Sequence, residues 1–328
     1  MSSSVLVTGG AGYIGSVTVE RLVAAGRGVV VLDNLSKGHR SAVRAGVPLV
    51  LGDIGDIELV TGLLRAHEID SVIHFAAMSL VAESMEKPAE YYDNNVVRGS
   101  RLLSAMSSVG VSKIVFSSSA GVYGEPESVP IIETARTEPV NVYGDTKRVF
   151  ERVLAWQAHA TGLKYISLRY FNAAGASSDC GEDHSPESHL IPIALQAAAG
   201  TRPELTVFGS DYDTPDGTCI RDYIDVRDLS DAHIAALNAL DEGRSGIYNL
   251  GNGEGASVLD VIETAEAVSG KKIPWEYGPR REGDPARLVA SASLAKEELG
   301  WKPVHPDLSD MIGAAWEWMQ RFPDGYPD

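Results

Sequence analysis

A short apolar run that leads through a glycine-rich turn into a helical pattern constrains this chain most. Residues 5–8 (VLVT) predict a buried strand, GGAGYIG occupies residues 9–15, and helical periodicity continues to Ala25, before Gly26. Gly9, Gly12 and Gly15 permit a tight turn and a close approach of ligand to backbone. Because unpaired N–H groups and the helix dipole favour anions at a helix start, this order predicts a pyrophosphate site.

The first half of the chain continues to alternate short apolar runs with helical patterns. Further strands are predicted over residues 29–33, 48–51, 72–76, 114–117 and 165–170, and helices over 57–67, 91–109 and 146–160. Strands that are apolar on both faces and separated by helices indicate a parallel sheet covered on both sides. The sequence therefore predicts an α/β fold with a doubly wound parallel sheet of the Rossmann type.

The regular alternation stops near residue 172. We predict a dinucleotide-binding domain over residues 1–172 and a smaller α/β substrate-binding domain over residues 173–328. Residues 173–188 are rich in small and polar side chains, and a helix is predicted near 191–199. A strand over 221–228 and a helix over 229–240 are also predicted, and we expect residues 220–242 to pack back on the first domain.

Charge and cysteine content exclude several classes of protein. The 28 Lys and Arg against 45 Asp and Glu give a net charge of −17, which disfavours extended nucleic-acid binding. Cys180 and Cys219 are the only cysteines, so a disulfide framework is excluded and a reducing cytoplasm is favoured. No apolar run approaches the ~18 residues of a membrane span, and the first residues lack the basic region of a signal peptide. We expect a cytoplasmic protein without nucleic-acid or membrane partners.

Carboxylates at the ends of two early strands indicate how a dinucleotide is held. Asp33 ends the second strand about twenty residues after the turn, where its carboxylate can bind the adenosine ribose. A carboxylate there repels a 2′-phosphate, so NAD is favoured over NADP. Asp53, followed by Ile54, fits either an adenine contact or a turn acid equally well. His74 ends the fourth strand and is expected to be a core histidine.

A serine, a tyrosine and a lysine are predicted to meet at the mouth of the sheet. Residues 117–119 are serines at the end of the fifth strand, and Tyr143 and Lys147 lie four apart on one helix face. A tyrosine that transfers protons at neutral pH needs its pKa of ~10 lowered by about three units. One cation contributes ~1–3 units, so Lys147 together with an oxidised nicotinamide ring is sufficient. A tyrosine and a lysine four residues apart are common on helices and by themselves indicate nothing. Because this pair follows the glycine turn, Asp33 and the serine run in that order, it indicates a catalytic site.

The chain resembles the extended short-chain dehydrogenases/reductases, and more narrowly the UDP-glucose 4-epimerase family. The resemblance runs nearly end to end. It is carried by VTGGAGYIG, VLDNLS, VIHFAA, KPAEYYDNNV, FSSSAGVYG, YGDTK, LRYFNAAGA, VFGSDYDTPDGTCIRDYIDVRDL, IYNLGNGEGASVLDV, PRREGD and the closing GYPD. The segment around Arg221 and the run RREGD are more specific than the glycine turn, which many related enzymes share.

The resemblance implies roles for residues in both halves of the chain. The implied catalytic residues are Ser119, Tyr143 and Lys147. The implied NAD contacts are Gly9, Gly12, Tyr13, Ile14, Gly15, Asp33, Asn34, Asp53, Ile54, Phe75, Ala76, Ala77, Ser79, Asn94, Ser117, Tyr143, Lys147, Tyr170 and Phe171. The implied nucleotide-sugar contacts are Ser119, Tyr143, Asn172, His189, Leu190, Thr206, Val207, Phe208, Arg221, Arg281, Asp284 and Leu288. Arginines that form bidentate bonds to a diphosphate fit this assignment.

The implied activity is the NAD-dependent interconversion of UDP-galactose and UDP-glucose, by transient oxidation at carbon 4 of the hexose and non-stereospecific hydride return. A dehydratase is disfavoured because Ala120 and Gly121 stand where its acids would follow the catalytic hydroxyl residue. Epimerisation of UDP-N-acetylhexosamine or UDP-glucuronate, or another nucleotide-sugar modification, stays open. A non-catalytic NAD sensor is disfavoured by the intact Ser/Tyr/Lys set.

Three positions depart from the pattern of many family members: Ser79 replaces a lysine, His189 replaces an asparagine, and Leu288 stands where side-chain bulk limits the sugar. The loop with Asp179, Cys180, Glu182, Asp183 and His184 fits no standard zinc spacing, and no metal is expected there. The family also implies a homodimer through the helices predicted over 91–109 and 146–160.

Overall fold

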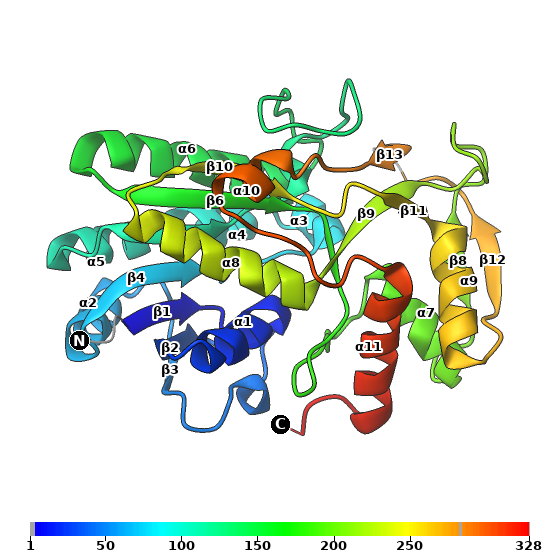
Figure 1. Ribbon diagram of the computed structural model, residues 1–328, viewed down its shortest axis with the longest axis horizontal. Coiled ribbons are helices and arrows are strands. Elements are labelled where there is room, and N and C mark those ends of the chain that lie inside the picture. Colours follow the sequence, from blue (N-terminus) through cyan, green and yellow to red (C-terminus); the bar gives the residue numbers. More distant parts are fainter. Residues whose placement is uncertain (1–3, 282–283, 328) are drawn as a thin grey trace.

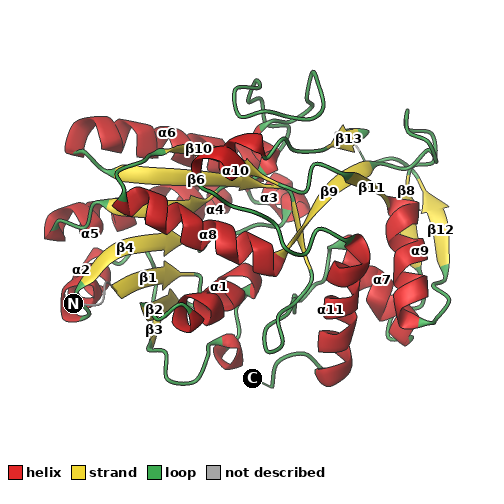
Figure 2. Ribbon diagram, viewed as in Figure 1, coloured by secondary structure: helices red, strands yellow, loops and turns green. Residues whose placement is uncertain are grey.

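The computed structural model describes residues 4–281 and 284–327, and a parallel seven-stranded sheet forms its centre (Figures 1 and 2). The spatial order of the strands is β10 (Gly246–Leu250), β6 (Lys164–Tyr170), β5 (Lys113–Ser117), β4 (Ile69–His74), β1 (Ser4–Thr8), β2 (Gly28–Asp33) and β3 (Leu49–Leu51). From β1, the chain first adds β2 and β3 on one side and then adds β4, β5 and β6 on the other, so β1 lies between β2 and β4. The predicted doubly wound Rossmann-type fold is confirmed.

Helices cover both faces of this sheet because the side chains of each strand alternate between two apolar clusters. Val5 and Val7 pack with α1 (Tyr13–Ala24) and α8 (Val226–Asp241). Leu6, between them, packs on the other face with α2 (Ile57–Ala66), α5 (Gly99–Val109) and α6 (Val142–Thr161). The inner strands β1, β4 and β5 are therefore buried along most of their length, whereas the edge strand β3 is partly exposed, with Leu51 51% exposed.

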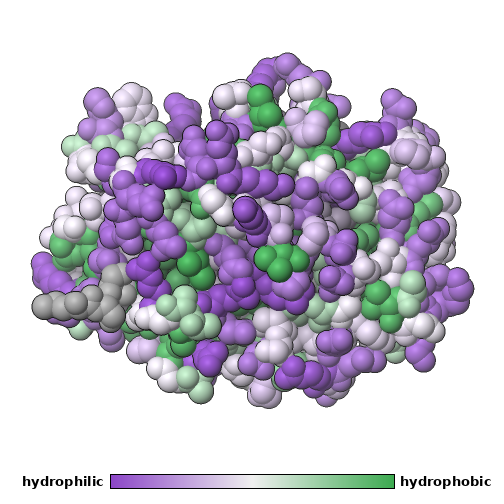
Figure 3. All heavy atoms as spheres, in the orientation of Figure 1, coloured by the Kyte–Doolittle hydropathy of each residue, from purple (hydrophilic) through white to green (hydrophobic). Residues whose placement is uncertain are grey.

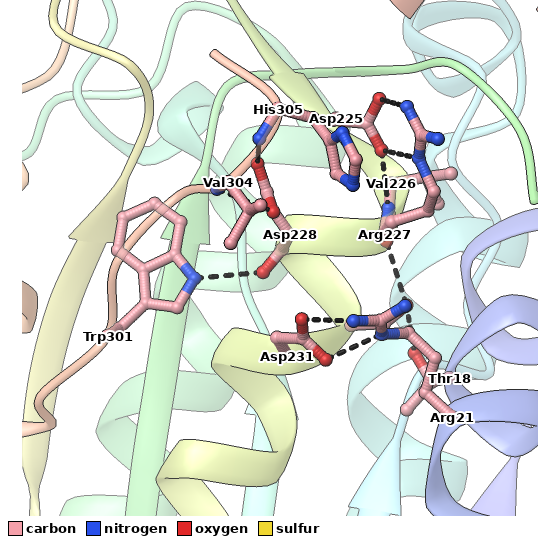
Figure 4. Close-up of polar contacts among 11 residues, drawn as sticks. Thr18, Arg21, Asp225, Val226, Arg227, Asp228, Asp231, Trp301, Val304 and His305 are labelled. Carbon is pink, nitrogen blue, oxygen red and sulfur yellow. Dashed lines mark hydrogen bonds and ion pairs between the residues drawn. The ribbon is translucent and has the colours of Figure 1, made fainter. Parts of the chain in front are cut away.

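Helix α8 is fixed at its start by polar contacts from three parts of the chain (Figure 4). The Asp225 side chain caps the helix by accepting a 2.8 Å hydrogen bond from the Arg227 backbone N–H. Arg21 of α1 forms an ion pair with Asp231. The carboxylate of Asp228 accepts backbone hydrogen bonds from residues 304 and 305, at 2.9 and 2.7 Å. These contacts hold α8 against α1 and bring the C-terminal segment to the same place.

A second group of elements lies beyond the carboxyl ends of the central strands, on the right in Figure 1. Its small sheets contain β7 (Asn172–Ala174), β9 (Ile220–Asp225), β11 (Gly255–Ser257) and β13 (Arg287–Leu288), and separately β8 (Leu205–Phe208) with β12 (Trp275–Gly278). The helices α7 (Leu190–Ala199), α9 (Val258–Ser269) and α11 (Leu308–Arg321) share an apolar core with these strands. The remaining short helices are α3 (Val81–Glu86), α4 (Pro88–Tyr92) and α10 (Ser293–Glu298).

Several predicted boundaries were wrong. The strand predicted over 221–228 ends at Asp225, because that side chain caps α8 and starts the helix three residues early. A single helix was predicted over 91–109. The structure instead has three consecutive helical segments there: the end of α4, a π-helical turn over Asp93–Arg98, and α5. Helix α6 starts at Val142 because Asn141 caps it, accepting a 2.8 Å hydrogen bond from Gly144. Strand β10 was not predicted, since Asn249 interrupts its apolar run; the buried amide bonds to Tyr123 and Ile131.

No helix within residues 4–281 and 284–327 is long and apolar enough to cross a membrane. The face of the molecule shown in Figure 3 is mostly hydrophilic, with apolar residues scattered among charged ones. This agrees with the net charge of −17.

Candidate active site

The glycine turn between β1 and α1 has the shape of an anion cradle. Gly9 has a φ of +73°, and a Cβ there would lie 2.6 Å from the Ala76 backbone nitrogen. Gly12 is the N-cap of α1 and has no side chain to occupy the cap; the nearest atom to a Cβ there is the Gly9 carbonyl oxygen at 3.5 Å. Gly9 is therefore required by the protein's own packing, whereas the absence of a side chain at Gly12 leaves the helix start open to a phosphate.

Asp33, at the carboxyl end of β2, is held beside this turn. Its carboxylate is 8% exposed and accepts 2.9 Å hydrogen bonds from the backbone N–H groups of Ala11 and Leu35. The same side chain therefore fixes the glycine turn and lies at the strand end where the ribose of a dinucleotide binds in this fold. Asn34 next to it turns away and accepts a hydrogen bond from the Ser36 backbone.

Ser119, Tyr143 and Lys147 come together where β5 ends against the first turns of α6. The Ser119 hydroxyl lies close enough to Tyr143 to act on the pKa of its hydroxyl, and it accepts a 3.1 Å hydrogen bond from the Gly121 backbone N–H. The Lys147 Nζ lies 5.7 Å from the centre of the Tyr143 ring. It also donates a 2.7 Å hydrogen bond to the carbonyl oxygen of Ser117. The three predicted catalytic residues are thus neighbours in space.

Burial dominates the electrostatics of this set. Burial raises the pKa of the Tyr143 hydroxyl, although the nearby Ser119 hydroxyl acts in the opposite direction. Burial also lowers the pKa of Lys147 to about 7, although the nearby Glu151 carboxylate opposes this. The protein alone therefore does not produce a phenolate at neutral pH. A further positive charge beside Tyr143 is needed, which a bound oxidised nicotinamide ring supplies.

The sequence did not predict a buried ion pair that lies next to the catalytic residues. Arg169 and Glu151 form a 2.6 Å ion pair with side chains 5% and 6% exposed. Glu151 also accepts a 2.6 Å hydrogen bond from the Ser118 hydroxyl, between Ser117 and Ser119. Glu151 lies one helical turn after Lys147, but nothing in the sequence indicates Arg169 as its partner. The ion pair therefore joins β6 to α6, and the Ser118 hydrogen bond joins the residue after β5 to the same carboxylate.

The other predicted cofactor residues surround the carboxyl ends of β1, β3, β4 and β5. Phe75 and Ala76 both hydrogen-bond through their N–H groups to the Thr8 carbonyl, so their backbone closes over the glycine turn. The hydroxyls of Ser117 and Tyr170 are 2.6 Å apart. Ser79 is exposed. The remaining residues of this group are partly or fully buried: Ile14, Ile54, Ala77, Asn94 and Phe171.

Asp53 and Tyr13, two predicted cofactor residues, bond to other parts of the protein, and His74 is part of the core. Asp53 forms an ion pair with Arg98 and accepts a 2.7 Å hydrogen bond from Gly55, so it acts at least as a turn acid. The Tyr13 hydroxyl donates a 2.6 Å bond to the Gly175 carbonyl, which points this side chain toward the second group of elements. His74 is 2% exposed, and burial lowers its pKa to about 3, so it is a neutral core histidine.

The predicted nucleotide-sugar residues lie on the second group of elements, and some of them pair with each other. Arg221 on β9 forms an ion pair with Asp284. The Arg281 guanidinium lies 4.1 Å above the centre of the Phe208 ring. Val207 is fully buried in the core of this group, and Thr206 is partly buried beside it. Glu282 and Gly283, in the RREGD run, lie outside the described residues.

Four further predicted substrate residues lie on β13, on β7 and at the start of α7. Leu288 on β13 pairs in register with Arg221 and packs, together with Phe171, against the cluster Val122, Tyr123 and Ile131. Asn172 pairs with Tyr223 on β9. His189 is the N-cap residue of α7 and lies 2.5 Å from Glu182, while Leu190 begins the helix. The predicted substrate residues thus extend from the sheet mouth along β9, β13 and α7.

The doubly wound sheet, the glycine turn with Asp33 and the Ser/Tyr/Lys set define the extended short-chain dehydrogenases/reductases. A model of the NAD dependent epimerase/dehydratase family matches residues 5–251. The chain belongs to this family. The family's dependence on NAD confirms the cofactor predicted from the sequence.

Full-length relatives share this similarity. UDP-glucose 4-epimerase from Halalkalibacterium halodurans is 53% identical over 98% of this chain and 97% of the relative. The crystal structure of UDP-glucose 4-epimerase from Brucella ovis in complex with NAD is 45% identical, with a TM-score of 0.94 over 97% of this chain and 98% of that one. That of the Bifidobacterium longum enzyme in complex with NAD⁺ and UDP is 40% identical, with a TM-score of 0.94 over 99% and 100%.

Proposed function

We propose that this protein is an NAD-dependent epimerase that interconverts UDP-galactose and UDP-glucose. One observation carries the proposal: Ser119, Tyr143 and Lys147 meet at the carboxyl edge of the sheet, between the glycine turn and the arginines of the second group. The curated relatives named UDP-glucose 4-epimerase, which match almost the whole chain, support the same activity. The structures of relatives with NAD, and with NAD⁺ and UDP, support both ligands.

The residues that hold NAD are proposed from the fit of the cradle described above. The start of α1 at Gly12 receives the pyrophosphate, and Asp33 binds the adenosine ribose. Ser117, Tyr170 and Lys147 border the nicotinamide end, where β5 and β6 terminate. When bound, NAD supplies the hydride acceptor and donor at carbon 4 of the hexose.

Tyr143 acts as the acid and base. As a phenolate it removes the proton from the 4-hydroxyl of the hexose, and it returns a proton to that oxygen after the 4-keto sugar has turned over. The Ser119 hydroxyl lies near the Tyr143 hydroxyl and can relay the proton. Lys147, held by the Ser117 carbonyl, adds a positive charge beside the tyrosine and binds the nicotinamide ribose.

The nucleotide part of the substrate is bound by the second group of elements, which matches the proposed division near residue 172. Arg221 and Arg281 can bind the diphosphate, and His189 at the start of α7 offers a further positive or hydrogen-bonding group. Phe208 presents a ring for the uracil base, and Asp284 can bind ribose hydroxyls. A substrate anchored through UDP leaves the sugar free to rotate, so that hydride returns to either face.

The neighbours of Ser119 disfavour elimination of water. Ala120 is 7% exposed, and a Cβ on Gly121 would meet the Ser119 hydroxyl oxygen at 3.3 Å. No acid side chain is therefore present at the two positions after Ser119 where dehydratases carry theirs. We assign the protein to the epimerases of this family, with an un-acetylated hexose as the preferred sugar.

We also propose a homodimer and a cytoplasmic location. Three large hydrophobic residues are exposed on the predicted dimer helices: Tyr92 is 36% exposed, Val97 44% and Trp156 68%. A second copy that packs on these helices would cover them. Cys180 and Cys219 are both free and buried, which agrees with a reducing compartment.

The activity is tested by incubating the purified protein with UDP-galactose, without added NAD, and following the anomeric signals by proton NMR. Formation of UDP-glucose to an equilibrium mixture supports the proposal, and an unchanged UDP-galactose signal contradicts it. Acid release of the bound nucleotide from the same preparation identifies the cofactor independently.

A further inference from the structure

The closing sequence GYPD carries part of the family resemblance, yet the proposed chemistry gives it no role. Its Tyr326 is 9% exposed and packs in an apolar cluster with Ala42 and Trp318. The Tyr326 ring stacks on the His39 ring, with ring centres 4.9 Å apart and planes inclined by 27°. Figure 1 shows the end of the chain beside the loop that follows β2, which carries His39. Asp328, the last residue of GYPD, lies outside the described residues. The segment after α11 is therefore joined to a loop of the cofactor-binding half.

The loop before α7 holds Tyr326 in this position. The Tyr326 backbone N–H donates a 2.9 Å hydrogen bond to Oδ2 of Asp183, and its hydroxyl oxygen accepts a 3.0 Å bond from the Gly181 backbone N–H. The preceding Gly325 has a φ of +76°, and a Cβ there would lie 2.2 Å from the same Asp183 oxygen. Glycine is therefore required before Tyr326. Because Tyr326 is bonded through both its backbone and its hydroxyl, its orientation toward His39 is fixed.

His39 in turn contacts the glycine turn between β1 and α1. Its backbone N–H donates a 2.9 Å hydrogen bond to the Ala11 carbonyl oxygen, and the Ala11 N–H donates a 2.9 Å bond to the Asp33 carboxylate. Gly38 packs so closely here that a Cβ would lie 2.7 Å from the Ala11 carbonyl carbon. Ala11 is thus held through its carbonyl by His39 and through its N–H by Asp33. Direct contacts therefore connect Tyr326 to the turn that forms the anion cradle.

We propose that Tyr326 is a positioning residue for NAD, which acts through His39 on the glycine turn and Asp33. The proposal rests on the NAD site at Gly12 and Asp33 put forward above. A binding site that is already ordered loses less conformational entropy when its ligand binds, and differences in affinity arise mostly from the dissociation rate. The stacked rings therefore slow the loss of NAD. These contacts do not involve β5 or α6, next to which the catalytic residues lie, so NAD-loaded protein should keep its turnover.

The test measures how fast NAD leaves the full-length protein. Purified protein with its bound cofactor is mixed with alcohol dehydrogenase and ethanol, which reduce released NAD⁺ to fluorescent NADH. Tyr326→Leu removes the ring that stacks on His39, and NAD should dissociate roughly 3–10-fold faster, as loss of one aromatic contact implies. Tyr326→Phe keeps the ring and should stay near the wild-type rate. UDP affinity should be unchanged in both variants, and excess NAD should restore the kcat of Tyr326→Leu.

A double-mutant cycle shows whether Tyr326 acts through His39. His39→Ala removes the other ring of the stack and should accelerate NAD loss to a similar extent. In the double variant His39→Ala/Tyr326→Leu, NAD should leave no faster than in the faster of the two single variants, because all three lack the same contact. Rates that multiply in the double variant would overturn the proposed route through His39.

Met311→Ala is the matched control. Met311 is buried on α11 in the core of the second group, in a cluster separate from that of Tyr326, and its truncation lowers stability there. Its NAD dissociation rate should equal that of the wild type. Equal NAD loss in Met311→Ala and Tyr326→Leu, or a wild-type rate in Tyr326→Leu, would overturn the proposal. Wild-type protein that carries no NAD would contradict the NAD site itself, and this proposal with it. If Tyr326→Leu does not fold, the comparison of His39→Ala with Met311→Ala decides.

Discussion

The Lys147 ammonium donates a 2.7 Å hydrogen bond to the main-chain carbonyl oxygen of Ser117. This bond joins the first turns of α6, which carry Tyr143, to the end of β5, two residues before Ser119. It also places a cation near the tyrosine ring, 5.7 Å from its centre. Together with the hydrogen bond from Ser118 to Glu151, this contact fixes α6 against the end of β5.

Replacing Tyr143 by phenylalanine should abolish turnover without unfolding the protein. The ring and its packing remain, but the group that exchanges the proton is lost. General acid–base catalysis contributes ~10²–10⁴-fold to rate, so kcat should fall by at least that factor while UDP affinity is retained. Tyr165→Phe on β6, outside the proposed site, is the matched control and should keep normal kcat. Normal turnover in Tyr143→Phe would exclude the mechanism.

Lys147 should make the stability of the NAD-free protein increase with pH. Burial lowers its folded-state pKa to about 7, whereas its pKa in the unfolded chain is ~10.4. Between these values the unfolded state binds more protons, so the free energy of unfolding rises with pH in that window. Urea unfolding of wild type and Lys147→Met at pH 6, 7, 8 and 9 measures the effect. The difference between the two proteins should move in favour of the wild type above pH 7, and a constant difference would refute the lowered pKa.

Two substitutions at Asp33 separate its two contacts. Asp33→Asn keeps an oxygen that can accept from Ala11 and Leu35 but removes the charge, so the turn should persist while discrimination against NADP declines. Asp33→Ala removes the acceptor as well and should also loosen NAD. Nucleotide released by acid from each purified protein is quantified by chromatography. Wild-type protein that yields a 2′-phosphorylated dinucleotide would contradict the role given to this carboxylate.

Leu288 should set a preference between hexose and N-acetylhexosamine. It lies on β13 opposite Arg221, beside Phe171 at the sheet mouth. A difference of a few methylenes is worth ~1–3 kcal/mol, so weak turnover of UDP-N-acetylgalactosamine is expected in the wild type. Leu288→Tyr should suppress that sugar selectively and Leu288→Ser should favour it. The ratio of kcat/KM for the two sugars tests this, and an unchanged ratio in all three proteins would show that the limit lies elsewhere.

The proposed dimer should depend on Trp156. This side chain is 68% exposed on α6, and a charge there should be incompatible with burial against a second copy. Analytical ultracentrifugation of Trp156→Glu should show a monomer where the wild type shows a dimer. Trp275→Glu changes a tryptophan on β12, away from the dimer helices, and should leave the wild-type mass. A monomeric wild type, or a dimeric Trp156→Glu, would remove these helices from the interface.

The sequence was informative wherever the structure depends on local pattern. The glycine turn, Asp33 and the pair Tyr143 and Lys147 are read from short-range spacing, because strand, turn and helix each have a short period. The parallel order of the first strands follows from the same alternation of apolar runs and helices. The family resemblance added the residues after 172, whose roles no local pattern reveals.

Contacts between distant residues could not be predicted in this way. Arg169 and Glu151 form their buried ion pair across the gap between β6 and α6. Arg221 and Asp284 pair across 63 residues of sequence. Strand β10 pairs with β6 in the central sheet, although about 75 residues, many of them in the second group of elements, separate the two strands in the chain. Its buried Asn249 interrupts the apolar run that would have indicated a strand. Glu182 and His189 meet only through the fold of the loop before α7, which has no periodicity in the sequence.

The central claim is that the hydrogen at carbon 4 leaves the hexose and returns to the same molecule while UDP anchors the substrate. The purified protein is incubated, without added NAD, with a mixture of two sugars: UDP-galactose deuterated at carbon 4, and UDP-[¹³C]galactose without deuterium. Mass spectrometry of the UDP-glucose formed shows which product molecules carry deuterium. The account predicts that deuterium remains at carbon 4 of the ¹²C product and is absent from the ¹³C product. Deuterium lost to water or transferred to the ¹³C sugar would contradict it.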